Sequence, residues 1–355
     1  MPLEVVLRAA PDAMLEAVGS PDVLPLLLSA QSGLTSEQDA LERALPNLLT
    51  RLHHLGVVPP EPLLYQGVVH EIIGLQEGPV LLNSRGRALL LDGGGLSVEL
   101  EDGSHVEVDS MEQEDSWHPI EGRDVVLCTH DTNPNSHIEA HPDKQGNEVD
   151  LGGHSVEDWT SSLSEAFAVI EAALPEWASE LPDTLQRLVP VGFHSEMHLS
   201  ASYREAPGVA YLTLHPSVLT LAEAIVHETQ HGKLNLLLWL DPVLSNGRTA
   251  WAESPVRPDL RPLIGVLLAV HAFAPVAALH ARLAAIGHPL AEGPSFQRRR
   301  AEVLSGNEGG LDILKQRAET TKSGERLLRD LEDLHRRTVE LGTGLPPADL
   351  GWPPG

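Results

Sequence analysis

The sequence predicts an α+β protein that is mostly helical and carries a small antiparallel β subdomain. Residues 1–57, and again those from 156 onward, repeat Leu and Ala at three- and four-residue spacing, which is typical of helices. Residues 63–129 contain short Leu- and Val-rich runs between glycine turns, which is typical of strands. A strand-like run at 201–214 then leads directly into an apolar helix at 221–240, and we expect these two elements to form the core of the C-terminal region.

Composition excludes several classes of protein. The 355 residues carry a formal charge of -27, from 51 acidic and 24 basic residues. This excess argues against nonspecific binding to nucleic acid or to an anionic membrane. A single cysteine, Cys128, excludes an internal disulfide framework and a Cys-rich metal cluster. No basic segment followed by an apolar one begins the chain, so we expect no signal peptide and a cytoplasmic protein.

The N-terminal half divides into two expected regions. Residues 1–57 form a helical region, with Ser36 as the cap of its last helix, and the prolines at 59–62 end it. Residues 58–130 form the small β subdomain, a sheet or partial barrel whose turns include Gly93-Gly-Gly95. Neither region offers chemistry that the sequence identifies.

The expected catalytic domain, residues 131–345, begins with a polar loop. Between 130 and 155 this loop contains His130, His137, His141 and His154. No pair of them has helix-face spacing within a helical pattern, so an ordered loop is favoured over a second metal site. The remaining expected elements are helices at 156–173 and 182–189, strands at 190–193 and 201–214, helices at 263–275 (bent at Pro275) and from 276, a charged helix over about 308–341, and a loose tail at 346–355.

The helix at 221–240 carries an H-E-x-x-H motif, His227-Glu-Thr-Gln-His231. Four residues advance a helix by slightly more than one turn, so His227 and His231 project from one face and can hold one metal ion. Thr220 and Glu223 have the spacing of a capping box at the start of this helix. A chance occurrence of the motif is the alternative in a chain with 18 His, and metal binding is favoured over it.

Two helical histidines need a third protein ligand. The candidates are Glu253 and His271; the third His of the short-spaced metzincin pattern is absent, because Leu237 stands in its place. Glu253 falls in a proline-rich loop, whereas His271 is the only polar side chain between Leu263 and Phe273. A lone His on an apolar helix is more often a core residue, but the need for another ligand favours His271 as the third.

The strand followed by the motif helix resembles the core of zincin-type folds. In a zinc peptidase Glu228 would be the general base acting on a zinc-bound water. Because imidazole suits both iron and zinc, the sequence pattern leaves the metal open.

Further stretches resemble the H-E-x-x-H proteins of ribosomal-peptide natural-product gene clusters, which are iron(II)/2-oxoglutarate-dependent peptide β-hydroxylases. The matching stretches are Asp131-Thr-Asn-Pro134, His141-Pro-Asp-Lys-Gln-Gly-Asn147, Asp150-Leu-Gly-Gly153, Ser200-Ala-Ser202, Pro207-Gly208, Leu221-Ala-Glu223 with His227 to His231, and Arg261-Pro-Leu263 through Val270-His-Ala-Phe273. The resemblance covers roughly residues 125–280.

The resemblance implies Fe(II), 2-oxoglutarate and O2 as cofactors, with zinc as the alternative metal. His227, His231 and His271 would be the metal ligands, and Arg257 or Arg261 would bind the distal carboxylate of 2-oxoglutarate. Glu228 would then hold a proton or support a ligand. The expected partner is a precursor peptide, with a radical-SAM maturase in the same pathway. The two other functions left open are a zinc metallopeptidase and a noncatalytic peptide-binding maturation partner.

Overall fold

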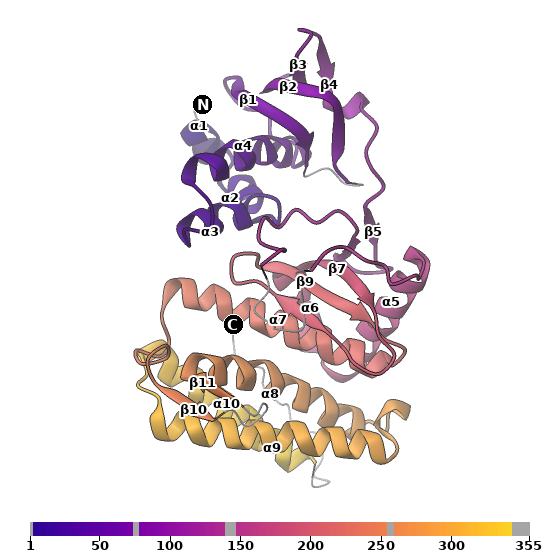
Figure 1. The fold of residues 1–355 in the computed structure, drawn as a ribbon, viewed down its shortest axis with the longest axis vertical. Coiled ribbons are helices and arrows are strands. Elements are labelled where there is room, and N and C mark those ends of the chain that lie inside the picture. The colour runs from indigo at the N-terminus through magenta and orange to yellow at the C-terminus, as the bar shows by residue number, and fades with distance from the viewer. Residues whose placement is uncertain (1–2, 74–77, 139–146, 254–258, 343–355) are drawn as a thin grey trace. The chain divides into compact units, whose positions relative to one another are not determined.

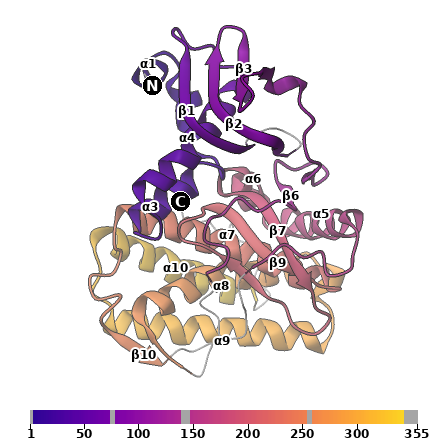
Figure 2. The same ribbon diagram turned by 45° about the horizontal axis from the view of Figure 1, so that its top comes forward.

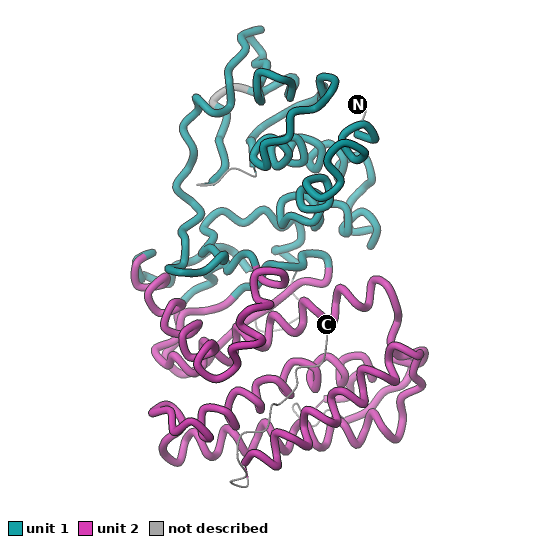
Figure 3. Tube along the Cα trace, turned by 180° about the vertical axis from the view of Figure 1, so that it is seen from behind, with its two compact units in different colours: residues 1–156, 186–192, 205–211 teal, residues 157–185, 193–204, 212–355 magenta. Residues whose placement is uncertain are grey.

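The computed structural model describes residues 3–73, 78–138, 147–253 and 259–342, and it has the expected α+β fold (Figure 1). The chain divides into two compact units (Figure 3). Unit 1 comprises residues 1–156, 186–192 and 205–211, and unit 2 comprises residues 157–185, 193–204 and 212–355. The expected tail at 346–355 lies outside the described residues.

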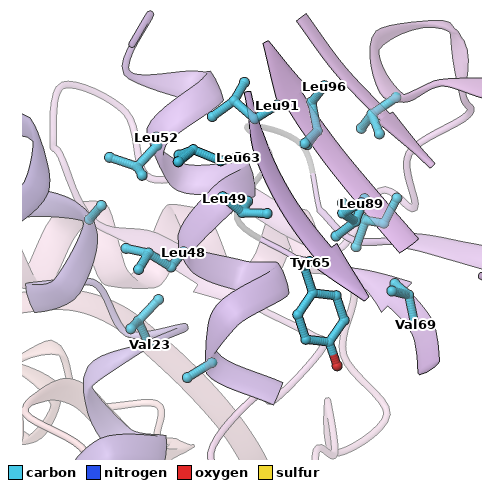
Figure 4. Packing of buried hydrophobic residues seen from close by; sticks show 14 of the residues in the cluster. Val23, Leu48, Leu49, Leu52, Leu63, Tyr65, Val69, Leu89, Leu91 and Leu96 are labelled. Carbon is cyan, nitrogen blue, oxygen red and sulfur yellow. The ribbon is translucent and has the colours of Figure 1, made fainter. Parts of the chain in front are cut away.

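Four helices and a four-stranded antiparallel sheet share one hydrophobic core in unit 1. The helices are α1 (Leu3–Ala9), α2 (Pro11–Gly19), α3 (Leu24–Gln31) and α4 (Glu37–His54), and the strands, in sheet order, are β1 (Leu63–Ile72), β2 (Val80–Asp92), β3 (Gly95–Leu100) and β4 (His105–Glu107). Leu49 and Leu52 of α4 belong to the same buried cluster as Leu63 of β1 and Leu89 of β2 (Figure 4). The two N-terminal regions that the sequence separates therefore fold around one core.

Two features of unit 1 were predicted correctly from residues close in sequence, a helix cap and a glycine turn. Ser36 caps α4 as expected, because its side chain accepts a hydrogen bond from the Asp39 N–H at 3.1 Å. The glycine turn after β2 is also confirmed: Asp92 pairs with Gly95, whose φ of +120° favours glycine. Each of these features depends on residues close in sequence.

A second sheet has the strand order β5-β6-β7-β9-β8. Its strands are β5 (Trp117–Pro119), β6 (Val126–Cys128), β7 (Leu185–Phe193), β8 (Ser200–Ser202) and β9 (Gly208–Leu214). The expectation that residues 63–129 form a single sheet is therefore wrong at its C-terminal end. β6 runs parallel to β7, and a parallel partner lies far away in sequence, where local patterns do not identify it.

Two more expectations around this sheet are corrected. The helix predicted at 182–189 does not form, since α6 (Pro175–Thr184) ends where strand β7 begins. Most of β7 is buried, so its apolar residues do not alternate with polar ones and resemble a buried helix in the sequence. The strand predicted at 201–214 is two strands, β8 and β9, separated by a turn around Arg204 to Pro207.

Unit 2 contains the α-helices that follow in the chain (Figures 1 and 2). They are α5 (Val156–Ala173), α6, α7 (Val218–Leu240), α8 (Leu263–Ala285), α9 (Pro294–Arg317) and α10 (Lys322–Leu341). The helix predicted at 156–173 is confirmed. One helix, α8, replaces the two expected around Pro275, and two helices replace the one expected at 308–341, because Thr321 starts and caps α10.

Helix α8 packs against α7, α9 and α10, and it is the one described helix long and apolar enough to cross a membrane by composition. Most of its residues, including Val266, Val270 and Leu279, are buried within the protein. The core helix of a soluble protein has the same properties, so one such helix is not sufficient evidence for a membrane protein.

Candidate metal centre

Helix α7 carries the H-E-x-x-H motif, and its N-terminus is fixed by a side-chain cap. Ser217 is the N-cap, accepting a hydrogen bond from the Thr220 N–H at 3.3 Å. The predicted cap at Thr220 is therefore wrong by three residues: Thr220 already lies inside the helix. From this start α7 runs through the whole motif to Leu240.

The two motif histidines lie together on one face of α7, as their spacing predicts. The ring centroids of His227 and His231 are 4.4 Å apart, and the rings are nearly perpendicular. Phe273 of α8 packs on His227, with ring centroids 4.5 Å apart. The two imidazoles thus project toward the interface between α7 and α8.

His271 reaches the same interface from α8. It is 9 % exposed, and its ring interacts with the backbone carbonyl of Gln230. Burial, then His231 and Lys233, lower the pKa of His271 to about 3. The structure therefore places His271 next to the motif, where a third ligand is expected.

All three imidazoles are in the protonation state that binds metals. Burial lowers the pKa of His227 well below its ordinary value, and His231 lowers it further. Burial also lowers the pKa of His231. The Nδ1 atoms of His227, His231 and His271 are buried and have no hydrogen-bond partner among the described residues. Neutral, unpartnered imidazole nitrogens fit a divalent metal such as iron or zinc.

The donor atoms do not yet form a complete ligand set. Within the ranges that the structure describes, no three His, Cys, Asp or Glu side chains are close enough to hold a metal ion as they stand. Binding a metal through His227, His231 and His271 would therefore require at least one side chain to turn. Such a turn breaks no hydrogen bond at the Nδ1 atoms, but a turn of His271 would break its contact with the Gln230 backbone.

Glu228, the central acid of the motif, is held by a strand of the same unit. Its Oε1 accepts a hydrogen bond from the Ser200 hydroxyl at 2.6 Å, and its Oε2 is buried without a partner among the described residues. Glu228 is 4 % exposed. A buried carboxylate with one oxygen fixed and one free can accept a proton from a nearby group.

Sequence analysis missed His198, which lies just before β8. Its ring interacts with the backbone of Thr213, and its Nε2 is buried and unpartnered within the described part of the chain. Burial lowers the pKa of His198 to about 4, and the neighbouring His215 also lowers it. His198 and His227 affect each other electrostatically. A pattern search could not select His198, because it has no regular spacing from the motif.

An ionic cluster around the buried Glu223 and His280 ties α7 to α8 and α9 one turn before His227. Glu223 accepts a hydrogen bond from His280 at 2.7 Å and two from the Arg299 guanidinium at 2.7 and 2.9 Å. His280 is 0 % exposed. Three helices meet at one carboxylate, so this cluster fixes the face of α7 that carries His227.

The other predicted residues lie elsewhere or outside the described residues. Arg257 falls among the undescribed residues 254–258. Arg261 lies on β11 (Leu260–Pro262), where its guanidinium pairs with Asp259 at 3.1 Å. Glu253, the competing third ligand, is exposed on the paired strand β10 (Trp251–Glu253). Of the two candidates for the third ligand, His271 contacts the motif backbone at Gln230, whereas Glu253 is exposed.

The polar loop at 130–155 lies in unit 1 and is partly built into its core. Asp131 accepts a hydrogen bond from the Tyr211 hydroxyl at 2.9 Å, and Asn133 and Asn135 are buried. Burial raises the pKa of Asp131. His141 is among the residues 139–146 that the structure does not describe. The described part of the loop therefore has the features of an ordered structural loop.

Comparison with known proteins gives no relative. No model of a known protein family matches the chain, and no curated protein is significantly similar to it.

Proposed function

We propose that the protein is an iron(II)- and 2-oxoglutarate-dependent oxygenase that hydroxylates a side-chain β-carbon of a ribosomally made precursor peptide. The observation that carries the proposal is the three buried, unpartnered imidazole nitrogens of His227, His231 and His271 at the α7–α8 interface. The cosubstrate and the peptide substrate come from the family resemblance of residues 125–280. We further propose a cytoplasmic location and a radical-SAM maturase in the same pathway.

The protein's own residues would have distinct roles. His227, His231 and His271 would hold iron(II), and iron with 2-oxoglutarate and oxygen supplies the oxidising chemistry that side chains lack. Glu228, held by Ser200, would keep a proton-accepting oxygen beside the motif histidines. Arg257 or Arg261 would bind the distal carboxylate of 2-oxoglutarate; Arg261 would first have to give up its contact with Asp259.

A zinc metallopeptidase is the second candidate, and one observation favours it. The Oε2 of Glu228, the acid of the motif, is buried and has no partner among the described residues, and a general base for hydrolysis needs such an oxygen. The peptidase and the oxygenase would use the same two histidines. They differ in the metal and in their need for oxygen.

The first experiment is metal analysis, followed by anaerobic titration of the iron(II)-loaded protein with 2-oxoglutarate. For an oxygenase we expect a visible metal-to-ligand charge-transfer band that is lost in His227→Ala. His271→Ala should also lose the band and Glu253→Ala should keep it. The matched control is His105→Ala, which removes an exposed histidine of β4 and should leave the band unchanged.

The other outcomes identify the other functions. Tightly bound zinc, no band and oxygen-independent peptide cleavage would establish the peptidase. Absence of any bound metal, with peptide binding that His227→Ala leaves unchanged, would establish the noncatalytic partner. Either result would overturn the oxygenase proposal.

A further inference from the structure

A second site lies in unit 2, where the C-terminal end of α7 meets the N-terminal end of α8. A pocket of about 310 Å³ opens there, and its wall includes Leu238 of α7, Leu244 of the connecting loop and Ile264 of α8. Pockets that bind small ligands have volumes of about 300–1,000 Å³, so this one fits a small molecule or one or two residues of a peptide.

Two arginines, Arg204 and Arg248, are among the residues that line this pocket. The guanidinium of Arg204 lies 4.1 Å from the centroid of the Trp239 ring, and its Nε is buried without a partner among the described residues. The Trp239 indole N–H in turn donates to the Arg204 carbonyl at 3.1 Å. These contacts hold Arg204 in place, whereas Arg248 is exposed at the rim.

Neither arginine forms an ion pair with any residue that the structure describes, although acidic residues outnumber basic ones 51 to 24 in this chain. Other arginines of the same unit are paired: Arg261 with Asp259 and Arg299 with Glu223. A carboxylate near the pocket, that of Glu319, is in contact with the Ser245 hydroxyl at 3.3 Å. Two arginines without an ion-pair partner among the described residues, both lining one pocket, are suited to a carboxylate supplied by a ligand.

The connecting loop that forms the wall is held in a strained conformation. Val243 lies between the pocket residues Pro242 and Leu244 and has a φ of +62°, which a β-branched residue rarely adopts. Its N–H donates to the Asp241 carboxylate at 2.6 Å, and its carbonyl accepts from the Thr321 N–H at 2.9 Å. The start of α10 thus holds the loop in the shape that leaves the pocket open.

The pocket is separate from the histidine site but lies along the same pair of helices. Leu238 is seven residues beyond His231 on α7, and Ile264 is seven residues before His271 on α8. Seven helical residues span about 10 Å. An extended peptide of about three residues covers that distance.

We propose that this pocket binds a carboxylate attached to an apolar group, with Arg204 and Arg248 holding the carboxylate and Leu238, Leu244 and Ile264 contacting the apolar part. The carboxylate can come from a free organic acid or from the C-terminus of a peptide. Carboxylate binding here requires neither iron nor 2-oxoglutarate, so it stands apart from the proposed oxygenase activity.

The test is calorimetric titration of the full chain with hexanoate and with hexanamide, its uncharged analogue. We expect hexanoate to bind and hexanamide not to bind. Arg248→Gln, at an exposed position, should weaken hexanoate binding about tenfold or more, because it removes charge-assisted hydrogen bonds. Ile264→Phe, which fills the pocket and keeps both arginines, should also weaken it. Arg326→Gln is the matched control: it removes an exposed arginine of α10 and should leave the affinity unchanged.

A second arm identifies the source of the carboxylate. Tighter binding of Ala-Leu than of hexanoate, lost when the dipeptide is amidated, would support a peptide C-terminus; tighter binding of hexanoate would support a free organic acid. Equal binding of hexanoate and hexanamide, no binding of either acid, or unchanged affinity in Arg248→Gln would overturn the proposal. Because His227→Ala should still bind hexanoate, failure of this proposal and failure of the oxygenase proposal are distinguishable.

Discussion

His130 and Glu71 form an ion pair in unit 1 whose strength depends on pH. The His130 Nε2 lies 3.2 Å from a Glu71 carboxylate oxygen, and the Nδ1 lies 3.6 Å from Glu114. The hydrogen bond that His130 donates to Glu71 raises the pKa of His130 above its ordinary 6.5 and lowers the pKa of Glu71 below 4.5. The pair therefore stabilises the fold most between pH 4.5 and 6.5.

We predict that His130→Gln removes this pH dependence. A raised histidine pKa contributes stability that is fully present below pH 6.5 and is lost as the pH rises through the folded-state value. In urea unfolding near pH 5.5, the free energy of unfolding of the variant should be lower than that of the wild type by up to about 1 kcal/mol. The difference should be smaller near pH 8.5. His105→Gln, at an exposed site, should show no pH-dependent difference. An equal loss at both pH values would contradict the prediction.

At the level of single residues, the sequence suggested His227, His231 and His271 as candidate metal ligands, because spacing on a helix and isolation on an apolar helix are local properties. It did not identify His198, and it did not predict that Ser200 holds Glu228. Both contacts depend on which strand packs against α7. That pairing involves segments about 30 residues apart, where sequence periodicity carries no information.

Helix α7 offers a test at the level of one element. Ser217→Ala should lower the free energy of unfolding by about 1 kcal/mol, because the Thr220 N–H would lose its partner at the helix start. Thr220→Ala is the control, since it keeps that N–H and should change stability by much less. Urea denaturation measures both variants. A larger loss of unfolding free energy in Thr220→Ala than in Ser217→Ala would contradict this prediction. It would mean that Thr220 is the cap, as the spacing between Thr220 and Glu223 indicates in the sequence.

The elements differ in how far local sequence predicts them. Helix α5 and the helix α4 with its Ser36 cap follow from periodicity and capping residues. Strand β7 does not, because it is buried along most of its length and its sequence has no alternation. The break between α9 and α10 was missed because the capping role of Thr321 was not recognised in a charged run.

For the whole molecule, the charge of -27 predicts a response to salt. Repulsion among like charges destabilises the compact state, and salt shortens its range from about 30 Å at 0.01 M to about 10 Å at 0.1 M. We expect the midpoint of thermal unfolding at pH 7 to rise over this range of NaCl. The control is the same comparison near the sequence pI of 4.9, where net charge is small and the rise should vanish. A midpoint that falls or stays constant at pH 7 would contradict the prediction.

By itself the sequence determined the α+β class, the helical and strand-rich regions, the charge, and the placement of His227 and His231 on one helical face, because these depend on composition and short-range periodicity. Tertiary structure alone decided that His271 contacts the backbone of Gln230 within the motif, that β6 pairs with β7, and that Arg204 and Arg248 line one pocket without a carboxylate partner among the described residues. These features come from residues distant in the chain, whose contacts depend on how whole elements pack.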